Sequence, residues 1–170
     1  IEGTALNELI YRHCPMAWEN IAPLYQQMLD AVDFAHSKGV IHRDVKPDNI
    51  MITNAGEVKV FDFGIAKSED SKGTKTGMGM GTVNYMAPEQ YLDAKNVGKT
   101  ADVYALGIVL YEMLTGKLPW KDEISDFSIM DKKRLGELES LANVGIVVPE
   151  HIVRAVEQVL LPNPNDRQSS

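Results

Sequence analysis

Residues 101–115 constrain the fold more than any other stretch, because their apolar side chains cover nearly the whole circumference of a helix. Thr100 is placed to cap this predicted helix, and Gly116 is placed to end it. A helix without a polar face is poorly suited to a surface, so we expect it in the middle of the domain. Its apolar positions are Val103, Ala105, Leu106, Ile108, Val109, Leu110, Met113 and Leu114.

A second helix is predicted over residues 21–35, where apolar side chains recur at helical spacing. Asn20 can cap it, which would leave Pro23 in the first turn, where a missing N–H group is harmless. Gly39 stands where a glycine commonly ends a helix. A last helix is predicted over residues 149–160, and the two prolines that follow stop it.

Two short β-strands are predicted after the second helix, over residues 50–53 and 58–61. Residues 54–56 supply a turn between them, so the strands should form a hairpin. Residues 67–81 are rich in glycine, serine and threonine and should bury little surface. The expected fold class is therefore mainly α with a small β-hairpin.

The composition is that of a soluble globular domain, with 44% hydrophobic and 24% charged residues in a chain of 170. The net charge of -7 argues against nucleic acid as the main partner. The single cysteine, Cys14, excludes an internal disulfide and fits a reducing, cytoplasmic location. No apolar run reaches the ~18 residues of a membrane span, so we expect no membrane contact within this segment. The chain does not start with methionine, and we expect it to begin inside a longer protein.

Four polar side chains on two neighbouring loops can carry phosphoryl transfer, a reaction that needs positioning and charge neutralisation more than covalent work. Asp44 can accept or orient the proton of a substrate hydroxyl group, and Lys46 can reach a phosphate as a point charge. Asn49 and Asp62 offer the hard oxygen ligands that suit Mg²⁺. These two residues flank the predicted hairpin, so both should lie near its base.

Three motifs, taken together in order and spacing, resemble those of eukaryotic-type Ser/Thr protein kinases. They are H-R-D-V-K-P-D-N at residues 42–49, D-F-G at 62–64 and A-P-E at 87–89. The placement of Thr74 and Thr76 and the A-P-E-Q run at residues 87–90 resemble bacterial receptor-type kinases in particular. The resemblance implies that residues 1–170 form the C-terminal lobe of a kinase catalytic domain. Residues 41–49 would be its catalytic loop, residues 62–64 its metal-binding loop and residues 62–89 its activation segment.

The resemblance also implies a reaction, the transfer of the ATP γ-phosphate to Ser or Thr hydroxyl groups of protein substrates. Asp44 and Lys46 would be the catalytic residues, and Lys46 is typical of the Ser/Thr-specific form of the loop. ATP would be bound by Lys46, Asn49, Asp62 and Met51, with Met51 as an apolar floor beneath adenine. Asn49 and Asp62 would hold Mg²⁺, or Mn²⁺ in its place.

Other residues would support this site by the same resemblance. His42 would pack and support the backbone, and Asp102 would hold the backbone of the catalytic loop. Glu89 and Arg167 would form a buried ion pair that anchors the activation segment. The implied structural set is His42, Phe63, Gly64, Glu89, Asp102 and Arg167.

A regulatory set is implied as well. Arg43 would be neutralised by a phosphate on the activation segment, which would order that segment. Thr74 or Thr76 is the hypothetical site of this phosphate. Thr82 would hydrogen-bond Asp44 and Lys46.

Three parts of the kinase pattern do not occur in this sequence: the Gly-rich loop over the phosphates, the lysine of the third strand and the glutamate that pairs with it. We therefore expect the N-terminal lobe to be absent from this chain, to be its partner in the same protein, and to be needed for activity. A pseudokinase or scaffold module is the alternative function, although the intact motifs speak against it. A small-molecule kinase of the aminoglycoside or choline type is a second alternative. Lys46 with Pro47, and residues 87–89, favour a protein substrate.

Overall fold

The computed structural model describes residues 2–63, 82–93, 95–120, 123 and 125–167. Within these ranges the chain forms seven α-helices and one three-stranded antiparallel sheet, so helix predominates as the sequence predicts. The helices are α1 (Leu6–His13), α2 (Trp18–Ser37), α3 (Thr82–Tyr85), α4 (Pro88–Leu92), α5 (Thr100–Thr115), α6 (Asp126–Leu135) and α7 (Glu150–Val159).

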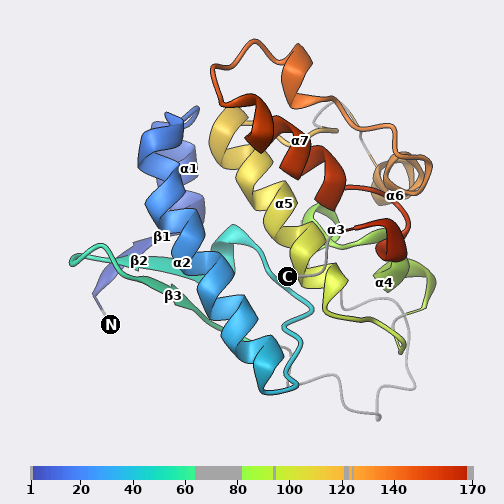
Figure 1. Cartoon of the computed structure of the whole chain (residues 1–170), viewed down its shortest axis with the longest axis horizontal. Helices are drawn as coiled ribbons and strands as arrows, with labels where there is room; N and C mark the ends of the chain where they lie inside the picture. The colour runs from blue at the N-terminus through green and yellow to red at the C-terminus, as the bar shows by residue number, and fades with distance from the viewer. Residues whose placement is uncertain (1, 64–81, 94, 121–122, 124, 168–170) are drawn as a thin grey trace.

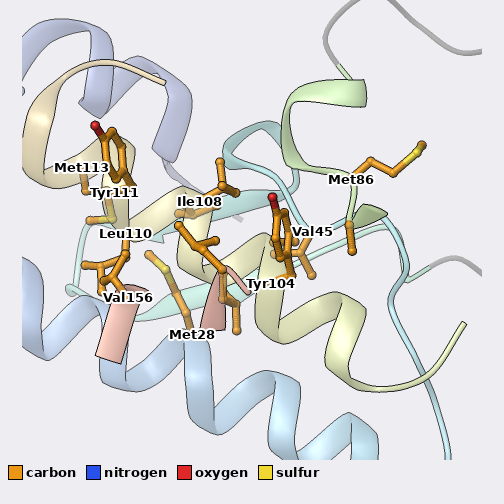
Figure 2. Close-up of a cluster of buried hydrophobic side chains, with 14 of the residues drawn as sticks. Met28, Val45, Met86, Tyr104, Ile108, Leu110, Tyr111, Met113 and Val156 are labelled. Atoms are coloured by element: carbon orange, nitrogen blue, oxygen red, sulfur yellow. The ribbon is translucent and has the colours of Figure 1, made fainter. Parts of the chain in front are cut away.

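Helix α5 lies at the centre of the helical part, between α2 and α7, as its apolar pattern predicts (Figure 1). Figure 2 shows Met28 of α2 and Val156 of α7 in one buried cluster with Ile108 and Leu110 of α5. Gly107 lets α7 come close, because a Cβ atom there would lie 2.6 Å from Val159 Cγ2. The core is therefore organised around α5.

Helix α2 begins earlier than the sequence predicts. It starts at Trp18, so Asn20 lies inside the helix instead of capping it, and Pro23 lies beyond the first turn. Trp18 is partly buried against the core, and this tertiary packing outweighs the local capping signal. The other end is as predicted: Gly39 has a φ of 74°, the left-handed conformation that closes many helices.

The predicted hairpin is present, formed by β2 (Ile50–Thr53) and β3 (Val58–Val60). A third strand, β1 (Gly3–Ala5), pairs antiparallel with β2, so the sheet has the order β1-β2-β3 and the expectation of a hairpin alone was wrong. The strand is short and begins at a glycine, which gives little signal in the sequence. Gly3 is needed there, because a Cβ atom would collide with the backbone of Ile52.

The remaining helices have clear ends. Helix α5 starts at Thr100, which is therefore its first residue rather than its cap, and α7 is one residue shorter at each end than predicted. Helix α6 is capped by Ser125, whose side chain accepts from the Ser128 N–H, and is ended by Gly136 with a φ of 73°. Among the described residues, no helix combines the length and the apolar content that crossing a membrane would require.

Candidate active site

The buried carboxylate of Asp102 on α5 fixes the backbone of the 41–49 loop. The N–H of His42 donates to Asp102 Oδ2 at 2.8 Å, and the N–H of Arg43 donates to Oδ1 at 2.7 Å. Arg43 has a φ of 66°, a left-handed conformation that non-glycine residues seldom adopt. It allows two consecutive N–H groups to converge on one anion. Asp102 thus holds the loop backbone in the way that the resemblance implies.

Asp102 also contacts His36 of α2, which belongs to none of the sequence motifs described above. His36 Nε2 lies 2.8 Å from Asp102 Oδ2, and each side chain is 1% exposed. The other ring nitrogen, Nδ1, is buried and has no hydrogen-bond partner in the described part of the chain. One carboxylate therefore joins α2, α5 and the 41–49 loop.

The side chain of His42 supports the loop from beneath. Its Nε2 lies 2.7 Å from the carbonyl oxygen of Phe61, and its ring centroid lies 4.5 Å from that of Phe63. Its Nδ1 accepts from the Asp44 N–H at 3.3 Å. These contacts require the proton on Nε2, so the ring is a neutral bridge between the loop and the residues after β3.

Three predicted site residues are joined in one polar cluster on the 41–49 loop. Lys46 Nζ donates to Asp44 Oδ2 at 2.9 Å, and Asn49 Nδ2 donates to the same oxygen at 3.3 Å and to the Asp44 carbonyl at 2.8 Å. The side chains of Lys46 and Asp44 remain 21% and 35% exposed, so both can be reached from solvent. Asn49 donates through its nitrogen, which turns its amide oxygen away from Asp44.

The hairpin brings the residue before Asp62 next to Asn49. The N–H of Phe61 donates to the Asn49 carbonyl at 2.8 Å, and Asp62 follows with an exposed side chain and a φ of 55°. An amide oxygen and a carboxylate at one hairpin base form a donor set that fits Mg²⁺. In the described ranges no three His, Cys, Asp or Glu side chains are grouped to hold a metal ion by themselves. An ion here would therefore need phosphate and water as its other ligands.

The other predicted positions fall in different places. Met51 lies on β2, opposite Lys59 of β3, and is half-buried. Some predicted positions lie outside the described residues, namely Gly64 and the stretch 67–81 with Thr74 and Thr76. The predicted contacts of Thr82 also lie outside them, because only the backbone of this residue, at the start of α3, is described.

Helix α3 is fixed to α5 by a hydrogen bond from Tyr85 to Glu112. The Tyr85 hydroxyl donates to Glu112 Oε2 at 2.6 Å. Burial raises the pKa of Glu112 above its ordinary value, the Tyr85 hydroxyl opposes that rise, and the charge of Asp48 adds to it. This pair is not predicted from the sequence, because its members are 27 residues apart and neither belongs to a motif.

Gln90 on α4 joins the segment 82–89 to the 41–49 loop. Its Nε2 donates to the Arg43 carbonyl at 2.8 Å, and its Oε1 accepts from the Ala87 N–H at 2.9 Å. Tyr85 and Met86 border a small recess beside Asp44. The segment 82–89 therefore lies directly against the predicted catalytic aspartate.

Arg167 anchors the end of this segment. It forms two hydrogen bonds with Glu89, from Nη1 to Oε1 at 2.6 Å and from Nη2 to Oε2 at 2.9 Å. The Arg167 side chain is fully buried and also donates to the carbonyls of Leu161, Thr100 and Pro162. The ion pair that the resemblance implies is present, and its arginine is the more heavily bonded partner.

Comparison with known proteins agrees with the motifs. The protein kinase domain family matches the chain over residues 1–170. The probable serine/threonine-protein kinase PknB of Lactococcus lactis is 37% identical over 157 residues, which are 92% of this chain and 25% of that protein. The serine/threonine-protein kinase PknA of Mycobacterium tuberculosis is 44% identical over 121 residues, 71% of this chain and 28% of that protein. PknL of the same species is 35% identical over 168 residues, 98% of this chain and 42% of that protein.

The chain thus spans between 25% and 42% of the length of these relatives. The family matches residues 1–170, and the three relatives match 71% to 98% of the chain, so the similarity extends well beyond the short motifs. The resemblance to bacterial Ser/Thr kinases is confirmed, and the chain belongs to the protein kinase family.

Proposed function

We propose that the protein carrying this chain transfers the γ-phosphate of ATP to serine or threonine hydroxyl groups of other proteins. The observation that carries the proposal is the cluster of Asp44, Lys46 and Asn49 at the hairpin base that leads to Asp62. A general base, a phosphate-neutralising cation and two oxygen ligands are the parts that phosphoryl transfer needs.

Each residue of the cluster has a separate task. Asp44 receives the hydrogen bond of the substrate hydroxyl and takes its proton as the oxygen bonds to the γ-phosphorus and the bond to the ADP oxygen breaks. Lys46, 2.9 Å from Asp44, neutralises charge on the transferred group. Asn49 and Asp62 would hold Mg²⁺. Bound ATP and Mg²⁺ would supply the phosphoryl group and screen its charge.

We further propose that this chain is the C-terminal lobe of the catalytic domain, with the ATP-gripping elements supplied by an N-terminal lobe elsewhere in the protein. Two facts support this: the sequence contains neither a Gly-rich phosphate loop nor a V-A-I-K lysine, and the chain spans less than half of each relative described above. The catalytic loop would be residues 41–49, the metal-binding loop residues 62–64 and the activation segment residues 62–89. The substrates of the relatives' family, proteins with Ser or Thr, would be its substrates.

The test compares the full-length protein with its variants in a transfer assay using ATP labelled at the γ-phosphate and a Ser/Thr peptide. Replacing Asp44 by Asn should lower the rate by at least about a hundredfold, because general-base catalysis is lost. Asp62→Asn should weaken Mg²⁺-dependent nucleotide binding in calorimetry. Asp33→Asn, an exposed position on α2, is the matched control and should retain full activity.

Three results would contradict the proposal. Nucleotide binding without any transfer by the wild type would indicate a pseudokinase. Transfer to an aminoglycoside or choline but to no peptide would indicate a small-molecule kinase. Robust transfer by the isolated 170-residue chain would contradict the proposal that a second lobe is required.

A further inference from the structure

Lys133, in the last turn of α6, is completely buried and faces no carboxylate among its described contacts. Its side chain is 0% exposed, and its Nζ donates to the carbonyl oxygens of Val83, Asn84 and Met86 at 2.7, 2.9 and 2.7 Å. An ammonium group carries three N–H donors, and a neutral amine carries two. Three short bonds to three carbonyls therefore match the charged form of the side chain.

Two aromatic rings complete the surroundings of this ammonium. Lys133 Nζ lies 4.3 Å from the ring centroid of Trp120 and 5.5 Å from that of Tyr104, within the range of cation–π attraction. Trp120 also donates from Nε1 to Asn84 Oδ1 at 3.0 Å. Burial lowers the pKa of Lys133 well below its ordinary value. The carbonyl groups and the rings therefore have to offset the cost of placing a charge in the core.

The three carbonyls belong to the stretch that borders the proposed catalytic aspartate. Val83 and Asn84 lie in α3, and Met86 lies between α3 and α4. Tyr85 and Met86 line the recess beside Asp44. Fixing these carbonyls fixes the path of the backbone at the place where a peptide substrate would pass Asp44.

Stability alone does not require a charge at this position. A methionine has a similar length, fills a similar volume and carries no desolvation cost, and buried ionic groups can often be replaced by apolar side chains without loss of stability. What an apolar side chain cannot do is bind three carbonyl groups in one arrangement.

We propose that Lys133 is a positioning residue that holds the 83–86 backbone in the arrangement that receives the protein substrate. The inference rests on the proposed kinase function, because it assigns Lys133 to substrate docking at that site. Lys133 acts through the backbone of the segment and does not touch the reacting atoms.

The test uses the full-length protein with Lys133→Met, and Lys132→Met as the matched control. Lys132 is the neighbour on the same helix, is 38% exposed and pairs with Glu123 at the surface. In Lys133→Met the KM for a peptide substrate should rise about tenfold, as expected for lost hydrogen bonds to a charged group, while the KM for ATP stays unchanged. Amide hydrogen exchange should become faster at residues 83–86 and stay unchanged in α2 and α7.

Hydrogen exchange separates this inference from the proposed function. If the wild type transfers no phosphate, the kinase proposal fails, but faster exchange confined to 83–86 would still support the anchoring role of Lys133. The inference is overturned if Lys133→Met changes neither the peptide KM nor this exchange, or if exchange rises equally in all elements. Should Lys133→Met fail to fold, Lys133→Gln keeps two donors without the charge and is judged by the same two measurements.

Discussion

Two backbone segments meet at the candidate site, and each is held by a buried charge of opposite sign. In the 41–49 loop, consecutive N–H groups converge on the carboxylate of Asp102. In the segment 83–86, carbonyl groups converge on the ammonium of Lys133. The left-handed conformation of Arg43 turns two backbone N–H groups to one side. The short helix α3 instead leaves carbonyl groups without partners inside the helix.

The comparison shows that the local backbone geometry decides which buried charge can hold a segment. Where N–H groups are left free, the charge is an anion, and where carbonyl groups are left free, it is a cation. Asp102 has a second partner in His36, while Lys133 relies on the rings of Trp120 and Tyr104. The two charges lie on different helices, α5 and α6, and Gln90 joins the 41–49 loop to Ala87, the residue directly after the second segment. Each charge can therefore be removed by a separate substitution.

The largest effect is expected for Asp102→Asn. The substitution keeps one acceptor oxygen but places an amide NH₂ against backbone donors, so the free energy of unfolding should fall by about 2–4 kcal/mol. Urea denaturation, followed by tryptophan fluorescence, measures the change. Asp33→Asn, exposed on α2, should shift the midpoint little, and an equal shift in both variants would show that Asp102 is not a special anchor.

A smaller and asymmetric effect is expected at the ion pair of Glu89 and Arg167. Arg167→Lys should lower the free energy of unfolding by about 2–3 kcal/mol, because it removes the second bond to Glu89 and strands backbone carbonyls as well. Glu89→Gln should cost about 1 kcal/mol, since Glu89 is partly exposed and the amide still accepts one bond. Equal losses in the two variants would mean that the carbonyl contacts of Arg167 contribute nothing.

The bridge between the two segments gives the third prediction. Gln90→Ala removes the bonds to the Arg43 carbonyl and the Ala87 N–H, both part-buried, and should lower the free energy of unfolding by about 1–2 kcal/mol. Amide exchange at Ala87 should become faster in the same variant. If exchange there is unchanged, the two segments are held independently and Gln90 is not a bridge.

The smallest effect is expected from the titration of Lys133. The pKa of Lys133 is lower in the folded protein than in the unfolded chain. At a pH between these two pKa values, the unfolded chain holds the proton and the folded protein has released it. The free energy of unfolding of the wild type should therefore increase relative to that of Lys133→Met between the lowered pKa and the ordinary lysine value of about 10.4. Parallel denaturation curves at pH 7 and in the alkaline range measure this. A constant difference would show that Lys133 keeps an ordinary pKa, and Lys132→Met should follow the wild type.

The sequence predicts the centre of the fold well, because α5 and the hairpin carry local patterns that do not depend on distant contacts. It predicts the start of α2 poorly, since the packing of Trp18 overrides the capping signal of Asn20. The strand β1 was missed because its partner is about 50 residues away and its own pattern is only three residues long.

The candidate site divides in the same way. The polar cluster around Asp44 lies within one short loop and can be predicted from its motif. Lys133 was missed because the run D-K-K-R at residues 131–134 has the composition of a solvent-exposed helix surface. A signal was available: Ile129 and Met130 lie four and three residues before Lys133, which places the lysine on the buried face of α6. Glu112 and His36 depend on tertiary contacts alone.

The pairing of β2 with β3 has a consequence for how this chain can vary in length. The contact that sets Asn49 beside Phe61 lies at one end of the hairpin, and the exposed turn at residues 54–56 lies at the other. Insertions in that turn would lengthen the hairpin away from the site and leave the pairing at its base intact. Deletion of a single residue between Val58 and Phe61 would instead reverse which face each following side chain occupies. Natural variation in this hairpin should therefore be concentrated in its turn.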